Sequence, residues 1–369
     1  MFRFLYCWVY TLFLVFAVAC KSEPNSTAKE LTSPFPAGET VDFKFFASEN
    51  ILSGMFDSPA DPANGLILFI HGYGPSDVRG WNMYGDLRPR FNALGFATAT
   101  WDKPGQGQSS GTFDINQSVY DSAEEVIAAE DYLRQTGAPG SDNIGLWGVS
   151  RAGWIAPIAL LQDDELNFWI SVSGTTAEDN FAHLLLSNLP YEDGTPELAQ
   201  QLRAEWQAGC KAFRTQEPYE SYLQATSTLR ANEYTLNMRG DWPNQAQYES
   251  QQASCRDGQC PRVDEDLCDY IFIEDFDTML SQLDVDVLAL FGERDLNINW
   301  RKVRALYSET IGNNPNATLA IEEFANADHN LNQSETGSLK EMTNQTPKTK
   351  VEGYYATQTD WLKTRGLGK

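Results

Sequence analysis

Ser150 is the residue of this sequence best placed for nucleophilic chemistry. It lies in the run GVSRAG at 148–153, which follows an apolar strand pattern at 144–149 and precedes a helical pattern at 154–161. A strand, a tight turn and a helix that meet at one serine are typical of a nucleophile elbow, because the strained turn projects the hydroxyl and small neighbours allow close approach. Ala152 stands where the GxSxG pattern has glycine, and we expect the turn to accommodate it.

A serine hydroxyl becomes a strong nucleophile only when a base takes its proton, and an acid must orient that base. The sequence contains 3 histidines. His71 follows an apolar run and precedes Gly72, which is typical of a structural turn, and His183 lies outside any motif. His329, in a loop after the apolar segment 318–324, is therefore the predicted base.

The predicted acid is Asp295, which follows the strand pattern at 287–291. Glu293 lies in the same loop and Asp328 precedes His329, so both are competing candidates for the acid. Asp295 is kept as the predicted acid, and either competitor stays open as an alternative.

Attack on a carbonyl carbon also requires two backbone N–H groups that face the developing oxyanion. Arg151, the residue after the nucleophile, supplies one of them. The other is expected from the turn HGYG at 71–74, with Tyr73 favoured over Gly74. Both contributions use the main chain, so the side chain of Arg151 remains free for another role.

Several short, nearly continuous apolar runs surround these residues, and such runs are typical of parallel strands covered on both faces. They lie at 66–70, 96–101, 144–149, 168–172 and 287–291. Helical patterns lie between them, and two earlier segments at 41–45 and 51–56 indicate an antiparallel pair at a sheet edge. The alternation predicts an α/β fold with a doubly wound, mostly parallel sheet.

One interval breaks the alternation. Residues 175–281 show no strong strand pattern but contain helix-like polar and aromatic segments. We expect a mainly helical cap domain there, inserted between core segments 39–174 and 282–369. Aromatic residues of the cap either pack it or line an acyl pocket: Trp206, Phe213, Tyr219, Tyr222 and Trp242. The Arg151 side chain either holds a substrate carboxylate or pairs with a cap acid, and the pairing is favoured.

The cap also contains a set of cysteines: Cys210, Cys255, Cys260 and Cys268. In an oxidising compartment they are expected to form disulfides, with three possible pairings. A zinc site is the alternative, but the spacing is loose. The acidic run 264–266 lacks EF-hand spacing, and the segment 104–111 lacks the ending of a phosphate-binding loop, so no metal and no cofactor are expected.

The N-terminus has the pattern of an export signal: Arg3 precedes an apolar run at 4–19 that is short for a membrane span. The sequence AVAC at 17–20 resembles the lipobox of bacterial lipoproteins, in which Cys20 becomes the lipidated first residue. Lipidation leaves an even set of cysteines, whereas ordinary cleavage and secretion, the alternative, leaves an odd one. We expect a signal peptide at 1–19, then the lipidated cysteine and a flexible tether at 20–38.

Lys21 after the cysteine implies, by the same resemblance, an outer-membrane location that faces the periplasm or the cell surface. The charge balance supports a membrane contact through the lipid alone: 27 Lys+Arg against 51 Asp+Glu give a net charge of −24. Such a surface repels phosphate backbones and anionic lipids, so nucleic acid is excluded as a partner. The oligomeric state is left open.

Five motifs in order resemble the α/β-hydrolase superfamily, in particular its capped bacterial esterase/peptidase-like branch, over about residues 40–369. They are HGYGP at 71–75, WDKPGQGQS at 101–109, GVSRAGWIAP at 148–157, FGERDLN at 291–297 and ADHNLNQSETGS at 327–338. The chain order Ser, Asp, His is the one expected there. Arg151 and Ala152 depart from the branch, which usually has Gln and Gly.

This resemblance implies a serine hydrolase that cleaves a carboxylic ester through an acyl-enzyme intermediate. A peptidase that acts on small peptides with the same triad is the alternative, because one triad performs both reactions. A catalytically inactive binding protein on this fold is a minor alternative. The expected partner is therefore a small ester or a short peptide.

Overall fold

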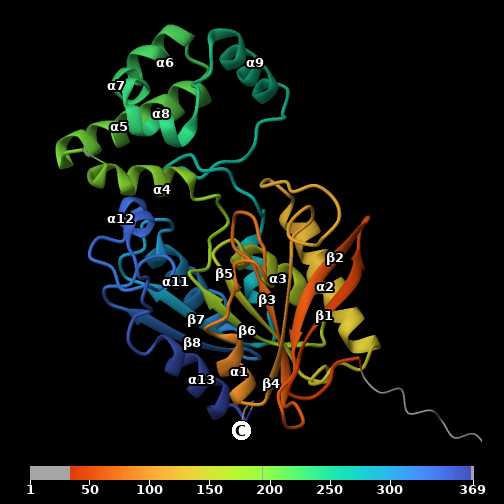
Figure 1. Cartoon of the computed structure of the whole chain (residues 1–369). Coiled ribbons are helices and arrows are strands. Elements are labelled where there is room, and N and C mark those ends of the chain that lie inside the picture. Colours follow the sequence, from red (N-terminus) through yellow and green to blue (C-terminus); the bar gives the residue numbers. More distant parts are fainter. Residues whose placement is uncertain (1–33, 193, 367–369) are drawn as a thin grey trace, which may run out of the picture. The chain divides into compact units, whose positions relative to one another are not determined.

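The computed structural model describes residues 34–192 and 194–366. Its strands are β1 (Thr40–Ala47), β2 (Asn50–Asp57), β3 (Gly65–Ile70), β4 (Phe96–Trp101), β5 (Ile144–Val149), β6 (Leu166–Val172), β7 (Asp286–Gly292) and β8 (Thr318–Phe324). They form one 8-stranded sheet in the order β1-β2-β4-β3-β5-β6-β7-β8 (Figure 1). Only the β1–β2 and β2–β4 pairs are antiparallel. The predicted doubly wound, mostly parallel sheet is confirmed.

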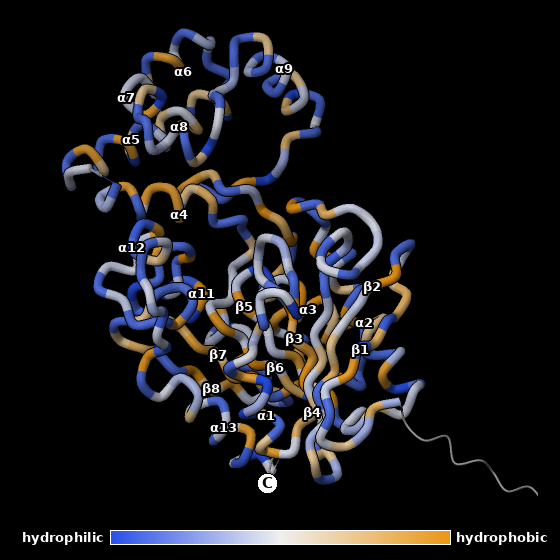
Figure 2. Tube along the Cα trace, in the orientation of Figure 1, coloured by the Kyte–Doolittle hydropathy of each residue, from blue (hydrophilic) through white to orange (hydrophobic). Residues whose placement is uncertain are grey.

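Both faces of the central strands are buried, as the continuous apolar runs require. On β3, Leu66, Leu68 and Ile70 belong to one hydrophobic cluster, whereas Ile67 and Phe69 belong to the other. Figure 2 shows hydrophobic residues concentrated on these strands. The first cluster is covered by α2 (Val119–Gln135), α3 (Ala152–Gln162) and α11 (Trp300–Glu309), the second by α1 (Arg88–Ala93) and α13 (Tyr354–Thr364).

Within the described residues, the regular secondary-structure elements between β6 and β7 are helices. Its helices are α4 (Phe181–Asn188), a 3-10 turn (Leu189–Tyr191), α5 (Pro196–Arg214), α6 (Tyr219–Ala225), α7 (Ser227–Ala231), α8 (Glu233–Arg239), α9 (Gln245–Arg256) and α10 (Phe276–Ser281). Helices α5 to α9 pack against one another (Figure 1). In α10, Phe276 and Leu280 join the cluster on the first face of the sheet. The predicted cap interval therefore ends with a helix that packs against the core.

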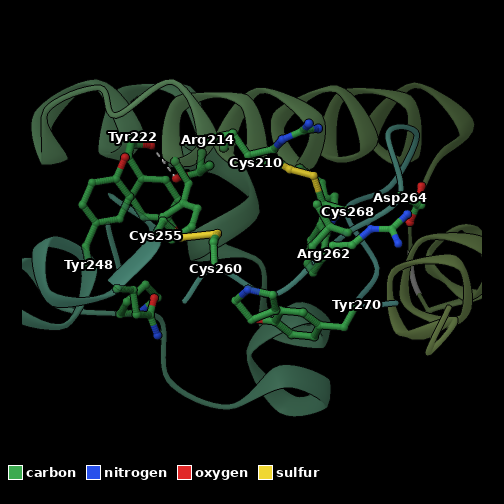
Figure 3. A pocket seen from close by; sticks show the side chains of 18 of the residues that line it. Cys210, Arg214, Tyr222, Tyr248, Cys255, Cys260, Arg262, Asp264, Cys268 and Tyr270 are labelled. Carbon is green, nitrogen blue, oxygen red and sulfur yellow. Dashed lines mark hydrogen bonds between the residues drawn. A yellow bond between two sulfur atoms is a disulfide. The ribbon is translucent and has the colours of Figure 1, made fainter. Parts of the chain in front are cut away.

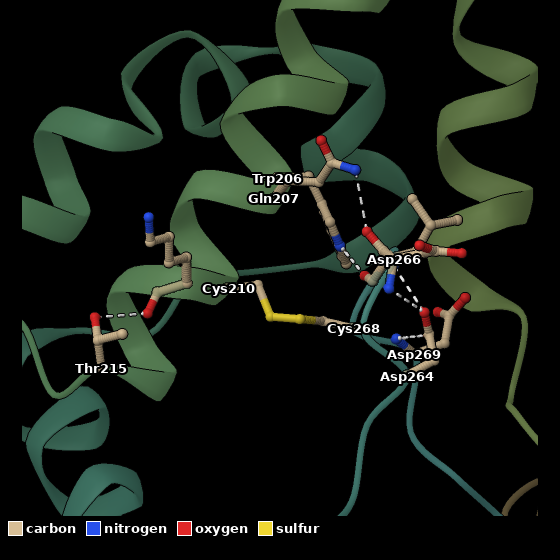
Figure 4. The surroundings of a disulfide bond; sticks show 10 residues. Trp206, Gln207, Cys210, Thr215, Asp264, Asp266, Cys268 and Asp269 are labelled. Atoms are coloured by element: carbon tan, nitrogen blue, oxygen red, sulfur yellow. Dashed lines mark hydrogen bonds between the residues drawn. A yellow bond between two sulfur atoms is a disulfide. The ribbon is translucent and has the colours of Figure 1, made fainter.

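Two disulfides stabilise this helical insertion, and they select one of the three possible pairings. Cys210 of α5 bonds to Cys268, and Cys255 of α9 bonds to Cys260. Around the first disulfide, the Trp206 indole donates to the carbonyl oxygen of Leu267 (Figure 4). The expected disulfides are thus present, and the cysteines are not available as zinc ligands.

The acidic run after Cys260 forms a turn. The Asp264 carboxylate accepts hydrogen bonds from the backbone N–H groups of Asp266, Leu267 and Asp269, at 2.7 to 2.8 Å (Figure 4). Within 34–192 and 194–366, no cluster of three or more His, Cys, Asp or Glu side chains has an arrangement that would hold a metal ion.

The predicted signal peptide and Cys20 lie outside the described residues, as does most of the predicted tether. Among the helices that the structure does describe, none is both long and apolar enough to span a membrane. The remaining described elements are a 3-10 turn (Ile311–Asn313) after α11 and the short helix α12 (Leu339–Asn344).

Candidate active site

Ser150 occupies the predicted sharp turn between β5 and α3. Its φ of 56° lies in the left-handed region, which non-glycine residues seldom adopt. The backbone N–H of Ser150 donates to the carbonyl oxygen of Val172 (2.9 Å), and its carbonyl accepts from the N–H of Gly153 (2.7 Å). These bonds hold a strained residue in place, which is the local geometry that an exposed nucleophile requires.

Ala152 fits the elbow because the residue opposite it is a glycine. A Cβ on Gly148 would lie 2.5 Å from the Cβ of Ala152, and a Cβ on Gly153 would lie 2.6 Å from the backbone nitrogen of Thr175. The close approach of strand and helix therefore depends on Gly148 and Gly153, and the methyl group of Ala152 uses the space that Gly148 leaves free.

The predicted base and acid are joined by a direct hydrogen bond. Nδ1 of His329 lies 2.7 Å from Oδ2 of Asp295, and both residues are buried. The other carboxylate oxygen of Asp295 accepts from the N–H groups of Asn297 (2.8 Å) and Ile298 (3.1 Å), which fixes the carboxylate. Asp295 follows β7 and His329 follows β8, so both lie at the carboxyl edge of the sheet, where open α/β folds place their sites.

The surroundings of His329 favour its charged form. Burial lowers the pKa of the imidazole, but the charge and hydrogen bond of Asp295, with the charge of Asp328, outweigh burial and raise it above its ordinary value. A buried imidazole next to a carboxylate can therefore take a proton and stabilise the resulting cation.

Neither of the competing acids forms a hydrogen bond with His329 in the part of the chain that the structure describes. Asp328 is buried, and one of its carboxylate oxygens accepts from the N–H groups of Asn330 (2.8 Å) and Asn332 (2.9 Å) in its own turn. Glu293 is exposed. Asp295 is thus the carboxylate that orients His329 in this structure.

The end of β6 contacts the segments of both the predicted nucleophile and the predicted base. Val172 accepts the hydrogen bond from Ser150, and the next residue, Ser173, donates its hydroxyl to the carbonyl oxygen of His329 (2.7 Å). Within the described residues, the structure shows no hydrogen bond between the hydroxyl of Ser150 and His329. The sequence offered no signal for Ser173, which lies at the end of the first predicted core segment (39–174).

The turn after β3 lies against the elbow. A Cβ on Gly72 would lie 3.3 Å from the carbonyl oxygen of Val149 and 3.5 Å from the Cβ of Ser150. Tyr73 follows directly, and in the described part of the chain no protein acceptor is present for the backbone N–H of Tyr73 or of Arg151. These are the two predicted oxyanion donors, and they flank Ser150 from separate segments.

The side chain of Arg151 is buried, and its partners differ from the expected one. Its guanidinium donates to the hydroxyl of Ser122 (3.0 Å) and to the carbonyl oxygen of Gln117, and it lies 5.6 Å from the centre of the Tyr73 ring. The favoured pairing with a cap acid is wrong. The start of α2 lies closer to the elbow than the cap does at this point, and it satisfies the guanidinium with neutral acceptors.

Within the described residues, the other two histidines have hydrogen-bond partners other than Asp295. His71 is buried between the Tyr84 hydroxyl (2.8 Å from Nδ1) and the carbonyl oxygen of Trp101 (2.5 Å from Nε2), and burial lowers its pKa to about 4. His183 in α4 lies 3.5 Å from the hydroxyl of Ser187 in its own helix. His71 is therefore a structural turn residue, as the sequence indicated.

The helical insertion contains a cavity of about 880 Å³ (Figure 3). Tyr222 and Tyr248 stack in its wall with ring centres 4.9 Å apart, and both disulfides contribute to the lining. Of the aromatic residues predicted to pack the cap or line a pocket, four line this cavity and Tyr219 does not: Trp206, Phe213, Tyr222 and Trp242.

Aromatic contacts link this insertion to the turn after β3. Phe272, two residues after Tyr270 in the cavity wall, packs edge-on against Trp154 with ring centres 5.1 Å apart. Trp154 in turn packs edge-on against Tyr73 at 6.3 Å. The first turn of α3 therefore contacts both the insertion and the turn after β3.

The chain belongs to the alpha/beta hydrolase family, whose model matches residues 67–337. No curated protein gives a significant match to the sequence. Among solved structures, the Pyrococcus furiosus esterase Pf2001 has 14% sequence identity and a TM-score of 0.51, with 94% of this chain and 96% of that chain covered.

A second solved structure, DcsB in complex with its substrate analogue, has 15% identity and a TM-score of 0.51, with 89% of this chain and 98% of that chain covered. At such identities the likeness is one of fold. Family and fold together make this protein an alpha/beta hydrolase, with esterases among its structural neighbours.

Proposed function

We propose that the protein is a serine hydrolase that cleaves a carboxylic ester through Ser150, His329 and Asp295. The hydroxyl oxygen of Ser150 attacks the ester carbonyl while His329 takes its proton, and Asp295 stabilises the imidazolium. The N–H groups of Tyr73 and Arg151 stabilise the oxyanion of the tetrahedral intermediate. His329 then gives the proton to the leaving alcohol, and the acyl group remains on Ser150.

Water completes the cycle. His329 takes a proton from a water molecule, the hydroxide attacks the acyl carbon, and the carboxylic acid leaves as Ser150 recovers its proton. No group other than these side chains, two main-chain donors and water is needed for the reaction to balance.

The observation that carries this proposal is the buried 2.7 Å hydrogen bond between His329 and Asp295, at the sheet edge where Ser150 holds its positive φ. The strained elbow and the free N–H groups of Tyr73 and Arg151 support it. The third link, from Ser150 to His329, is part of the proposal, and such bonds often tighten only when substrate is bound.

The test uses protein that begins at Lys21. It is expected to hydrolyse short-chain p-nitrophenyl esters and to be labelled by a fluorophosphonate, and Ser150→Ala is expected to abolish both signals. Ser308→Ala, on the exposed side of α11, is the matched control and keeps both signals. Unchanged labelling of Ser150→Ala would show that another residue is the nucleophile.

The peptidase alternative is an outcome of the same assay. Turnover of aminoacyl-naphthylamides above that of the esters would assign the triad to amide cleavage. If neither substrate class is cleaved and no label is incorporated, the binding-protein alternative replaces the enzyme.

We also propose that the chain is exported and anchored by a lipid on Cys20. The apolar run at 4–19 and the sequence AVAC at 17–20 support this proposal. The disulfides between Cys210 and Cys268 and between Cys255 and Cys260 agree with an oxidising compartment.

A further inference from the structure

Lys103 lies beneath the turn that offers the second oxyanion donor. It comes two residues after β4, and its ammonium group donates hydrogen bonds to the carbonyl oxygens of Gly72 (2.6 Å) and Gly74 (2.7 Å). These two carbonyls flank Tyr73 on either side. One side chain therefore holds both ends of the three-residue segment whose central N–H belongs to Tyr73.

The bond to Gly72 determines where the Tyr73 N–H points. The carbonyl of Gly72 and the N–H of Tyr73 belong to the same planar peptide group, and in a trans peptide they point in opposite directions. With the carbonyl held on Lys103, the N–H points away from the ammonium. A positive charge on the carbonyl side also polarises the peptide group, which makes its N–H a stronger donor.

This turn needs an external support because its own residues do not restrict it. Gly72 has no Cβ, and Gly74 has a φ of 88°, a conformation that glycine adopts freely. The peptide after Gly74 leads to Pro75, so it contains no N–H of its own. In the absence of Lys103, the Gly72–Tyr73 peptide would rotate easily and its donor would lose its direction.

The surroundings of Lys103 disfavour the charged form of its amine. Lys103 is only 9% exposed. Three charged or titratable side chains face it from the neighbouring elements: Glu125 of α2, Arg151 before α3 and His71 at the end of β3. Burial and the charge of Arg151 lower the pKa of Lys103 to about 8, while Glu125 opposes them. Burying one cation beside another is expensive, and the two backbone carbonyls offset part of that cost.

We propose that Lys103 is a positioning residue of the oxyanion hole, whose ammonium directs the N–H of Tyr73 at the tetrahedral intermediate. This inference rests on the proposed function and deepens it. A residue that acts in this way changes kcat more than KM, because the oxyanion exists only after the attack. The effect of Lys103 on kcat also depends on whether its amine is protonated.

Two substitutions separate the effect of the Lys103 charge from the effect of its side-chain size. Lys103→Met keeps an unbranched side chain without the charge, and is expected to lower kcat about 10- to 100-fold with KM nearly unchanged, less than the full loss of one oxyanion donor. The affinity for an alkyl trifluoromethyl ketone, which forms an oxyanion on Ser150, is expected to fall by a similar factor. Lys103→Arg keeps the charge and is expected to restore most of both.

The pH profile is the readout that a merely structural role would not change. In the wild type, kcat is expected to decline as pH rises through about 8, since the ammonium loses its charge there. Lys103→Arg is expected to shift this decline to higher pH, and Lys103→Met to remove it. His71 does not account for it, because its pKa of about 4 is far below this range.

The experiment uses the full chain in detergent, with Lys363→Met as the control. Lys363 is an exposed lysine of α13 whose ion-pair partner, Asp360, is three residues away. The inference is overturned if Lys103→Met keeps the wild-type kcat and ketone affinity, or if the wild type shows no alkaline decline. If Lys103→Met does not fold, the pH profiles of kcat for Lys103→Arg and the wild type test the inference instead. Absence of Ser150-dependent turnover in the wild type would instead contradict the proposed function.

Discussion

The hydroxyl of Ser173 donates a 2.7 Å hydrogen bond to the main-chain carbonyl oxygen of His329, a residue 156 positions later in the chain. Ser173 is fully buried and follows β6, the strand between those that lead to Ser150 and Asp295. The bond therefore joins the loop that contains His329 to the end of β6, where Val172 accepts the hydrogen bond of Ser150.

Ser173→Ala is expected to lower kcat about 10-fold and to destabilise the protein by about 1 to 3 kcal/mol, because it leaves a buried carbonyl without its donor. Steady-state kinetics and thermal unfolding measure the two effects. Ser308→Ala removes a hydroxyl that donates to the carbonyl oxygen of Arg304 on the exposed side of α11, and is expected to change neither kcat nor stability. Equal kcat and equal stability of the two variants would mean that the Ser173 hydroxyl does not hold the loop of His329 in place.

Asp295→Asn is expected to lower kcat by about 10³- to 10⁴-fold, because the imidazole loses the partner that orients it and stabilises its charge. In the wild type, kcat/KM should rise with pH as His329 loses its proton, with a midpoint above the ordinary histidine value of 6.5. Without the carboxylate, burial dominates and this midpoint should move to lower pH.

The same pair links stability to pH. Because the pKa of His329 is raised by folding, the stabilisation from its pairing with Asp295 is fully present below about 6.5 and is lost as pH rises through the folded-state pKa. Unfolding curves of wild type and Asp295→Asn should therefore differ more at pH 5.5 than at pH 9. A difference that grows with pH would contradict the assignment of the pair.

The two disulfides are expected to contribute unequally to stability. In the chain-entropy view, the Cys210–Cys268 bond, with a sequence separation of 58, is worth about 4 kcal/mol, and the Cys255–Cys260 bond, with a separation of 5, about 2 kcal/mol. Replacing both cysteines of one pair by serine, followed by denaturant unfolding and limited proteolysis, measures each. A greater loss of stability on removal of the Cys255–Cys260 bond would show that contacts in the folded state outweigh loop entropy.

Cys20→Ala is expected to abolish incorporation of labelled palmitate and to release the protein from the membrane fraction, since the thioether to the lipid cannot form. Ester turnover should persist, because residues 33–369 form one compact unit with its own core. Cys7→Ala, within the apolar run, is the control and should leave labelling intact. Palmitate that still enters Cys20→Ala would remove the basis for the lipoprotein proposal.

The elements and their order could be read from local patterns. Nearly continuous apolar runs predicted β3 to β7, and the steric demands of a tight turn predicted Ser150 between strand and helix. Asp295 and His329 were predictable because each follows a strand, and the carboxyl ends of parallel strands meet at one edge of the sheet. These features depend on residues close together in the sequence.

The hydrogen-bond partners of Arg151, Ser173 and Lys103 could not be predicted from local sequence patterns. Arg151 binds Gln117 and Ser122, Lys103 binds carbonyls 29 and 31 residues away, and Ser173 binds one 156 residues away. Each bond exists only because the strand order 4-3-5-6-7-8 places the ends of these segments side by side. By itself the sequence determined the sheet, and it predicted Ser150 as the nucleophile with Asp295 and His329 as its partners. Only the tertiary structure decided what supports them, since that support comes from hydrogen bonds between distant segments, which no local pattern encodes.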